Sequence, residues 1–327
     1  MGMDPPTHLI IDEAGQTQVP EILVPLMLLN RDLPTAVVFA GDPRQLGPVI
    51  LSDAAEKLGL GTSLLEHLIE GHDPPEAQGM VGVHPLQINY RSHPAIISLF
   101  SSLFYPDLPA PGLQPKPGAA EAAAGLIDMP RAVTSLQAFG LPVTPETPLC
   151  FRHVQGHCTR GTSALSASWQ NEEEAREVLA VIQALRRGGV AAQDIVVCTP
   201  YRAQLTCIRR LLGPHPGAKG VEVDVVEKFQ GRESPVVIIS FVRSASPEGD
   251  TAAAAEAPGA GTGAGIGFLK NMKRLNVSLS RAQSLMIVVG NAKVLRAAGG
   301  QWAALIDKFS DWHALAAGLH TEAAELD

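Results

Sequence analysis

The chain has 327 residues, of which 46% are hydrophobic and 18% are charged, and its formal net charge is −8. The length and the hydrophobic content suit one large domain or two modest ones that bury a core, and no apolar run approaches the roughly 20 residues that span a bilayer. The acidic balance excludes a chain that binds nucleic acid through its overall charge, so any such binding needs a local basic channel.

The first part of the chain alternates short apolar runs with helical periodicity. The pattern predicts a strand at 8–11, a helix at 19–29, a strand at 35–40 and a helix at 62–69. Strands of this kind, alternating with helices, predict a parallel sheet covered on both faces, with ligands at the carboxyl ends of the strands. Residues 71–83 are polar and contain Gly and Pro, which indicates a linker.

A second unit begins at residue 86 and repeats the alternation of strands and helices. The expected elements are strands at 149–154, 194–198, 221–226, 236–241 and 285–289, and helices at 94–104, 171–187, 202–212, 271–281 and most of 294–319. Residues 106–148 show little periodicity, so we expect a loop insertion there. Residues 244–266 are dominated by Ala and Gly, which predicts a second, disordered insertion.

The four cysteines form no Cys-x-x-Cys pair, and no secretory signal precedes them. Free thiols in a reducing compartment are therefore the expected state. A zinc site within 150–158 is the less favoured alternative, because the Cys and His spacing there fits no standard zinc finger.

Two acids, Asp12 and Glu13, come directly after the first apolar strand. Such a pair can hold Mg²⁺ and polarise a water molecule. The pair alone is weak evidence, since a solvated turn or a helix cap accounts for it about equally well.

Six short segments with chemical character occur in a fixed order along the chain. They are Asp12-Glu13, Gly41–Pro48, Asn89–Pro94, Thr199–Tyr201, Glu227–Glu233 and Arg274–Ala282. In this order they resemble motifs II, III, IV, IVa, V and VI of superfamily 1B helicases of the Up-frameshift-like group. Residues 59–66 and 267–271 are similar to the Armitage and Moloney-leukaemia-virus-10 branch of RNA helicases, which is tied to small-RNA silencing.

This resemblance implies a fold and a set of nucleotide-binding residues. The fold is α/β, with one partial RecA-like domain at 1–80 and one complete RecA-like domain at 86–320, each a P-loop NTPase-type parallel sheet with flanking helices. The implied catalytic residues are Asp12 for Mg²⁺, Glu13 for the attacking water, Gln45 as the γ-phosphate sensor, and Arg91 and Arg281 as arginine fingers. The residues implied to face the nucleotide are Asp42, Gly231, Arg232 and Glu233. For either arginine taken singly, a surface salt bridge is the simpler interpretation.

The resemblance also implies a path for single-stranded nucleic acid. The expected contacts are Thr199, Tyr201, Glu227 and Asn276. The hydroxyl group of Thr199 and the aromatic ring of Tyr201 suit phosphate contact and base stacking. Local positive charge is expected from Arg202, Arg209, Arg210, Lys270, Lys273 and Arg274. For Arg209 and Arg210, an exposed helix face is an equally good interpretation.

One motif of the family is missing from the chain. No lysine follows a glycine, so the Gly-x-x-x-x-Gly-Lys-Ser/Thr loop that cradles phosphates does not occur. We therefore expect this chain alone to hydrolyse ATP at no useful rate.

The resemblance finally implies ligands, partners and a cellular setting. They are ATP with Mg²⁺, single-stranded RNA, proteins of a silencing pathway, translocation from 5′ to 3′, and a monomer in the cytoplasm, with the nucleus as the alternative. Two other interpretations stay open: an inactive paralogue that binds RNA or protein, and a helicase that acts on DNA.

Overall fold

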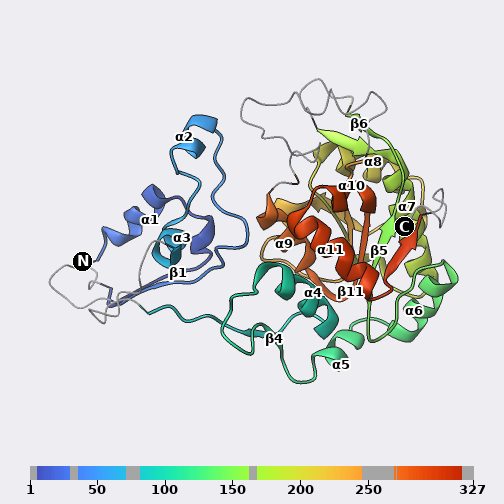
Figure 1. The fold of residues 1–327 in the computed structure, drawn as a ribbon, viewed down its shortest axis with the longest axis horizontal. Helices are drawn as coiled ribbons and strands as arrows, with labels where there is room; N and C mark the ends of the chain where they lie inside the picture. Colours follow the sequence, from blue (N-terminus) through green and yellow to red (C-terminus); the bar gives the residue numbers. More distant parts are fainter. Residues whose placement is uncertain are drawn as a thin grey trace. The chain divides into compact units, whose positions relative to one another are not determined.

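Strands and helices alternate along the chain as in an α/β protein, and all strands of the largest sheet run parallel (Figure 1). The computed structural model describes residues 6–29, 36–70, 82–161, 168–244, 269 and 271–318. The chain divides into two units, Met1–Pro85 and Leu86–Asp327. The parallel sheets and their flanking helices confirm the predicted fold class.

Unit 1 has a two-stranded parallel sheet of β1 (His8–Ile11) and β2 (Ala36–Phe39). Its helices are α1 (Val19–Leu26), α2 (Asp53–Lys57) and α3 (Leu64–Glu70), with a short 3₁₀ turn at Ala14–Gln16. One face of the sheet is apolar and open: Ile10 is 69% exposed and its cross-strand partner Val38 is 47% exposed. Two strands with an uncovered apolar face are not stable on their own in water.

Helix α1 is shorter than the predicted 19–29. A capping box of Gln18 and Glu21 starts it, and Pro25 lies in its last turn. Beyond Leu26 the backbone tightens, because Leu28 and Leu29 donate to carbonyl groups three residues back rather than four.

Unit 2 is built on a six-stranded parallel sheet of order β12-β5-β11-β10-β8-β9. The strands are β5 (Leu149–His153), β8 (Ile195–Thr199), β9 (Glu222–Val225), β10 (Ser234–Ser240), β11 (Ala282–Gly290) and β12 (Leu315–Ala317). The central strands β10 and β11 are buried on both faces, which explains their nearly continuous runs of Val and Ile.

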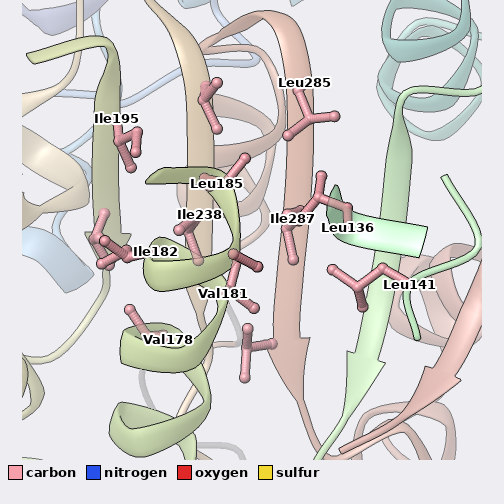
Figure 2. Close-up of a cluster of buried hydrophobic side chains, with 14 of the residues drawn as sticks. Leu136, Leu141, Val178, Val181, Ile182, Leu185, Ile195, Ile238, Leu285 and Ile287 are labelled. Carbon is pink, nitrogen blue, oxygen red and sulfur yellow. The ribbon is translucent and has the colours of Figure 1, made fainter. Parts of the chain in front are cut away.

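Helices cover both faces of this sheet. They are α4 (Pro94–Phe104), α5 (Ala119–Ala124), α6 (Met129–Ala138), α7 (Glu172–Arg187), α8 (Arg202–Leu212), α9 (Met272–Leu279), α10 (Ala292–Ala297) and α11 (Gly300–Asp311). Figure 2 shows α7 side chains such as Val178 and Val181 against Ile238 and Ile287 of the sheet. On the other face, Phe309 of α11 packs edge-on against Phe151 of β5.

A small antiparallel hairpin, β6 (Cys158–Arg160) and β7 (Trp169–Asn171), lies beside α8 (Figure 1). A second short pair joins β3 (Ile88–Asn89) to β4 (Gln114–Pro115). Neither pair was predicted, because strands of two or three residues are too short to show a period of two.

The prediction of a loop insertion at 106–148 is wrong. The segment contains α5 and α6, and α6 buries Met129, Ala132 and Leu136 in the core. Asp128 caps the helix by accepting from the Arg131 N–H group. The helical spacing was present in the sequence but short, between stretches rich in Pro and Gly. The insertion predicted at 244–266 falls almost entirely outside the described residues.

The helical prediction for 294–319 is wrong at its end. Ala298 and Gly299 separate α10 from α11, and both Gly299 and Gly300, the first residue of α11, have positive φ. Leu315–Ala317 is the edge strand β12, paired with β5. No helix among the described residues is long and apolar enough to cross a bilayer. The four cysteines are buried and form no disulfide, as expected.

A buried ion pair joins the sheet to α7. The Arg152 Nε atom lies 2.7 Å from Glu177 Oε1, and the side chains are 5% and 3% exposed. The same guanidinium group donates to the Gly140 carbonyl and lies over the Phe139 ring. Replacing one partner leaves the other charge unpaired in the core. The free energy of unfolding then falls by much more than it does when an exposed pair is lost.

We predict that Arg152→Met lowers the free energy of unfolding by about 3–5 kcal/mol. The matched control is Arg296→Met, which breaks the exposed pair of Arg296 with Asp307 and should cost less than about 1 kcal/mol. Urea unfolding of both variants measures the difference. Equal losses would show that the Arg152 pair contributes no more than a surface contact.

Candidate functional site

In unit 1, the two acids after β1 are exposed at the carboxyl end of the strand. Glu13 adopts a left-handed conformation with φ of 52°, and its N–H group donates to Asp12 Oδ1 over 2.9 Å. Glu13 Oε2 accepts from the Gln16 side chain over 2.8 Å. Both carboxylates therefore remain accessible to ligands from solvent, and the cation and water site predicted here stays a prediction.

The loop after β2 meets the loop after β1. A Cβ atom on Gly41 would lie 3.0 Å from the Gly15 nitrogen, and one on Gly15 would lie 3.1 Å from the Asp42 carbonyl oxygen. Only glycine allows this approach. The Asp42 carboxylate accepts from the Arg44 N–H group at 2.9 Å and from the Gln45 side chain at 3.1 Å. Asp42 thus fixes Gln45 at the same sheet edge as the two acids.

In unit 2, Arg91 is held by groups from two distant segments. Its Nε atom donates to Glu233 Oε2 over 2.6 Å, and its Nη1 atom donates to the Ser280 carbonyl over 3.1 Å. The turn before it is shaped by Asn89, whose side chain accepts from the N–H groups of Arg91 and Ser92. The Arg91 side chain remains 26% exposed, so its guanidinium group is partly open to a ligand.

Arg281 lies one residue beyond Ser280 but is buried, with 3% of its surface exposed. Its guanidinium group donates to the carbonyl oxygens of Val277 and Arg232 over 3.0 and 3.3 Å, and to the Ser280 hydroxyl over 2.9 Å. The expectation that Arg281 projects outward as a finger does not match this arrangement. Its hydrogen bonds to main-chain carbonyls instead tie the end of α9 to the loop before β10.

Glu233 is shared by Arg91 and Gln283, whose side chain donates to it over 2.9 Å. Arg232, next to it, forms a two-pronged pair with Glu222 at 2.7 and 2.6 Å, which lowers the pKa of the Glu222 carboxyl. Gly231 has φ of 72°, which glycine adopts without strain. The structure therefore gathers Arg91, Glu233 and Arg281 at the amino ends of β10 and β11, whereas the sequence pattern favoured carboxyl ends.

The predicted nucleic-acid contacts are mostly buried. Thr199 and Asn276 have no exposed surface and Tyr201 has 5%. The Thr199 hydroxyl group accepts from the Tyr201 N–H group, and Asn276 donates to the Tyr105 hydroxyl over 2.7 Å. Burial raises the pKa of Tyr201. Contact of these side chains with a strand therefore stays a prediction, and in this structure folding has already given them polar partners.

Several of the predicted basic residues already face carboxylates. Glu227 pairs with Arg274 at 2.7 Å, Arg210 with Glu172 at 3.4 Å and Arg209 with Asp224 at 3.7 Å. Arg202 is exposed and Lys273 is partly exposed. Lys270 lies outside the described residues.

A buried polar cluster at the carboxyl end of the sheet was not predicted. Glu174 Oε2 accepts from the Ser240 hydroxyl at 2.7 Å and from the Val242 N–H group at 2.8 Å. Gln204 donates to Ser240 at 3.0 Å and accepts from the Asn171 N–H group at 2.8 Å. In the sequence, Glu174 is the third acid of a helix start, where acids are ordinarily solvated, so nothing marked it as buried.

Burial raises the pKa of Glu174 to about 8. The hydrogen bonds from Ser240 and Val242 lower this pKa and so offset part of the effect of burial. Within the described residues, its Oε1 atom has no hydrogen-bond partner. Among those same residues, no group of three or more His, Cys, Asp or Glu side chains is arranged to hold a metal ion.

The raised pKa predicts a loss of stability with rising pH. The carboxyl is protonated more readily in the folded state than in the unfolded state, so its contribution is complete below about pH 4.5 and is lost as the pH rises through about 8. The slope of the unfolding free energy in that window reaches about 1.4 kcal/mol per pH unit. Urea unfolding at a series of pH values should show it, and Glu174→Gln should flatten it. An unchanged slope in the variant would rule out Glu174 as its source.

Comparison of the sequence with known proteins shows the family of this chain. Two family models, both described as an AAA domain, match residues 2–53 and 60–293. The chain is 38% identical over 303 residues to RNA helicase Mov10l1 of Homo sapiens, covering 88% of this chain and 22% of that protein. It is 34% identical over 301 residues to the protein named "Probable RNA helicase armi" of Drosophila melanogaster, covering 88% of this chain and 24% of that protein.

A third relative is a regulator of nonsense transcripts 1 homolog of Arabidopsis thaliana, 33% identical over 295 residues, covering 88% of this chain and 20% of that protein. The chain thus spans about a fifth to a quarter of the length of these relatives. The family match covers most of the chain and includes the segments that hold Arg91, Glu233 and Arg281. The chain belongs to the AAA-domain family of superfamily 1 helicases.

Proposed function

We propose that this chain is the C-terminal part of the motor of an ATP-dependent RNA helicase that moves from 5′ to 3′ along single-stranded RNA. The observation that carries the proposal is the convergence of Arg91, Glu233 and Arg281 in unit 2. They come from three segments far apart in the sequence, and their hydrogen bonds form one connected group. A partly open guanidinium group held by such a network suits the stabilisation of charge on a transferring phosphoryl group.

In this proposal unit 1 supplies the residues for the metal and the water. Asp12 and Glu13 are exposed carboxylates on a rigid strand end, which fits Mg²⁺, a cation that binds through one or two carboxylates and the phosphates of a nucleotide. When bound, Mg²⁺ neutralises charge on the phosphates. Gln45, held by Asp42, is placed to orient a water or sense the terminal phosphate. Residues 1–80 then belong to one RecA-like domain and 86–320 to a second.

Arg91 and Arg281 have different roles in the proposal. Arg91 is the finger: it exchanges its exposed pair with Glu233 for the nucleotide, which costs little because exposed pairs are weak. Arg281 is a positioning residue, because its buried guanidinium group fixes the carbonyl groups of Val277 and Arg232 around the Arg91 site. Glu233 holds Arg91 ready when the nucleotide is absent.

The chain by itself is proposed to bind RNA without hydrolysing ATP. It contains no Gly-Lys core of a phosphate-binding loop, and the open apolar face at Ile10 and Val38 is typical of a sheet that lacks a covering layer. This favours a second candidate function, a binding module without ATPase activity, for the chain acting alone.

The substrate and setting follow from the relatives. Two of them carry RNA helicase in their names, which supports RNA over DNA as the strand. Because Thr199, Tyr201 and Asn276 are buried, the strand would contact exposed or partly exposed groups such as Arg202 and Lys273. A role in RNA silencing, a cytoplasmic location and a monomeric motor are further parts of the proposal.

We predict that Arg91→Lys reduces RNA-stimulated ATP hydrolysis about 10³-fold or more in a chimaera that joins the P-loop segment of a relative to residue 8 of this chain. Lysine keeps the charge but loses the planar fork that matches a phosphate. The control, Arg296→Lys, changes an exposed pair elsewhere in unit 2 and should leave the rate unchanged. Equal rates for the Arg91 variant and the parent would refute the finger role.

A further inference from the structure

Residues from the β6–β7 hairpin and from the loop after β10 form a stack of one aromatic ring and two guanidinium groups. The Cζ atoms of Arg160 and Arg243 both lie 4.4 Å from the centroid of the Trp169 ring. Both guanidinium groups therefore lie within cation–π distance of the same indole ring. Arg243 is 4% exposed, whereas Arg160 and Trp169 are partly exposed. Arg160 is therefore the more accessible of the two guanidinium groups.

The hairpin that carries this stack is fixed in place. A Cβ atom on Gly161 would lie 2.7 Å from the Ala203 Cβ atom of α8, and one on Gly156 would lie 2.6 Å from Asn171 Oδ1. The Ser168 hydroxyl group accepts from the Ala203 N–H group over 3.1 Å. The close approach of Gly161 to Ala203 and the Ser168 hydrogen bond place the hairpin against the first turn of α8, which Figure 1 shows beside β6.

The inner arginine is fixed by the buried polar cluster. Val242 has φ of 72°, a conformation that a β-branched residue adopts only when its surroundings impose it. The Val242 N–H group donates to Glu174, and its carbonyl accepts from the Asn171 side chain over 3.2 Å. The strained turn aims the next residue, Arg243, at Trp169. Asn171 also donates to the Ser244 hydroxyl over 3.1 Å, so the turn is bound on both sides of Arg243.

We propose that Trp169, with Arg160 and Arg243, is a base-stacking subsite for single-stranded nucleic acid. A partly exposed indole ring with two cations supplies what binding of a single strand needs: a platform for a base and positive charge for phosphates. Arg160 leaves the ring for a phosphate, and a base takes its place on Trp169. This inference rests on the proposed function, since it assumes that the chain binds a single strand, and it assigns that binding to residues outside the six helicase-like motifs.

The position of the subsite agrees with this assignment. It lies at the carboxyl edge of the sheet, beyond the end of β10, whereas Glu233 precedes the start of the same strand. A strand of seven residues spans about 23 Å. The stack is therefore separated from the Arg91 group by the length of a rigid strand, so changes in one leave the geometry of the other intact.

The test measures binding of a short fluorescein-labelled oligouridine to the 327-residue chain by fluorescence anisotropy, without nucleotide. Trp169→Ala should raise the Kd by about 5- to 150-fold, and Trp169→Phe, which keeps a stacking ring, should restore most of the affinity. The matched control is Trp312→Ala: Trp312 is also partly exposed but precedes β12 at the opposite sheet edge. Its Kd should not change. Arg160→Gln should reduce the slope of log Kd against log salt concentration by about the amount expected for one phosphate contact.

A second readout detects the stack directly. A base on an indole ring quenches its emission, so oligouridine should quench tryptophan fluorescence in the parent and in Trp312→Phe but not in Trp169→Phe. This arm remains decisive if Trp169→Ala fails to fold. The same titrations with oligodeoxythymidine show whether the subsite takes RNA or DNA. If Trp169→Ala weakens the binding of oligouridine alone, the subsite is assigned to RNA.

The outcomes separate this inference from the proposed function. If the parent binds the oligonucleotide and the Trp169 variants bind and quench as the parent does, the subsite is refuted and the proposed function stands. If the parent binds neither oligonucleotide, the inference fails together with the nucleic-acid part of the proposed function.

Discussion

All residues of strand β10 except Pro235 are buried, and a buried strand of this kind can carry polar chemistry only at its ends. Glu233 precedes its first residue and binds Arg91. Ser240 is its last residue and binds Glu174. Because a parallel sheet covered on both faces is rigid and dry inside, it separates two polar groups while fixing the position of each. The two polar groups of unit 2 described above lie at these two ends.

At the amino end of β10, main-chain carbonyl groups bind the arginine side chains as much as other side chains do. Arg281 gives its hydrogen-bond donors to backbone carbonyl groups and to Ser280, so it shapes the loop before β10 rather than facing solvent. Arg91 keeps an exposed ion pair instead. In the proposed function, Arg281 builds the site and Arg91 meets the ligand, because an unpaired buried charge is costly and an exposed pair is exchanged at little cost.

The sequence predicted the fold class, the long helices and the order of the chemical segments, because apolar periodicity and motif spacing are local features. It did not predict α6, whose short helical period lies between stretches rich in Pro and Gly, or β12, which has three residues and exists through pairing with β5. It named Thr199 and Asn276 as contacts with nucleic acid, yet both are buried. Burial depends on which elements pack together, and a motif does not carry that information. For the same reason the sequence did not show that Glu174 is buried, because it stands in a row of acidic residues that are ordinarily exposed.

In the proposed function, this chain carries the arginine side and the strand-binding side of a helicase motor but not the loop that cradles phosphates. One sample of the purified chain tests it most directly, when binding of single-stranded RNA and RNA-stimulated hydrolysis of ATP are measured side by side. We expect saturable RNA binding with no hydrolysis above background. RNA-stimulated turnover by the chain alone would contradict it, because such turnover requires phosphate-binding groups that the sequence does not contain.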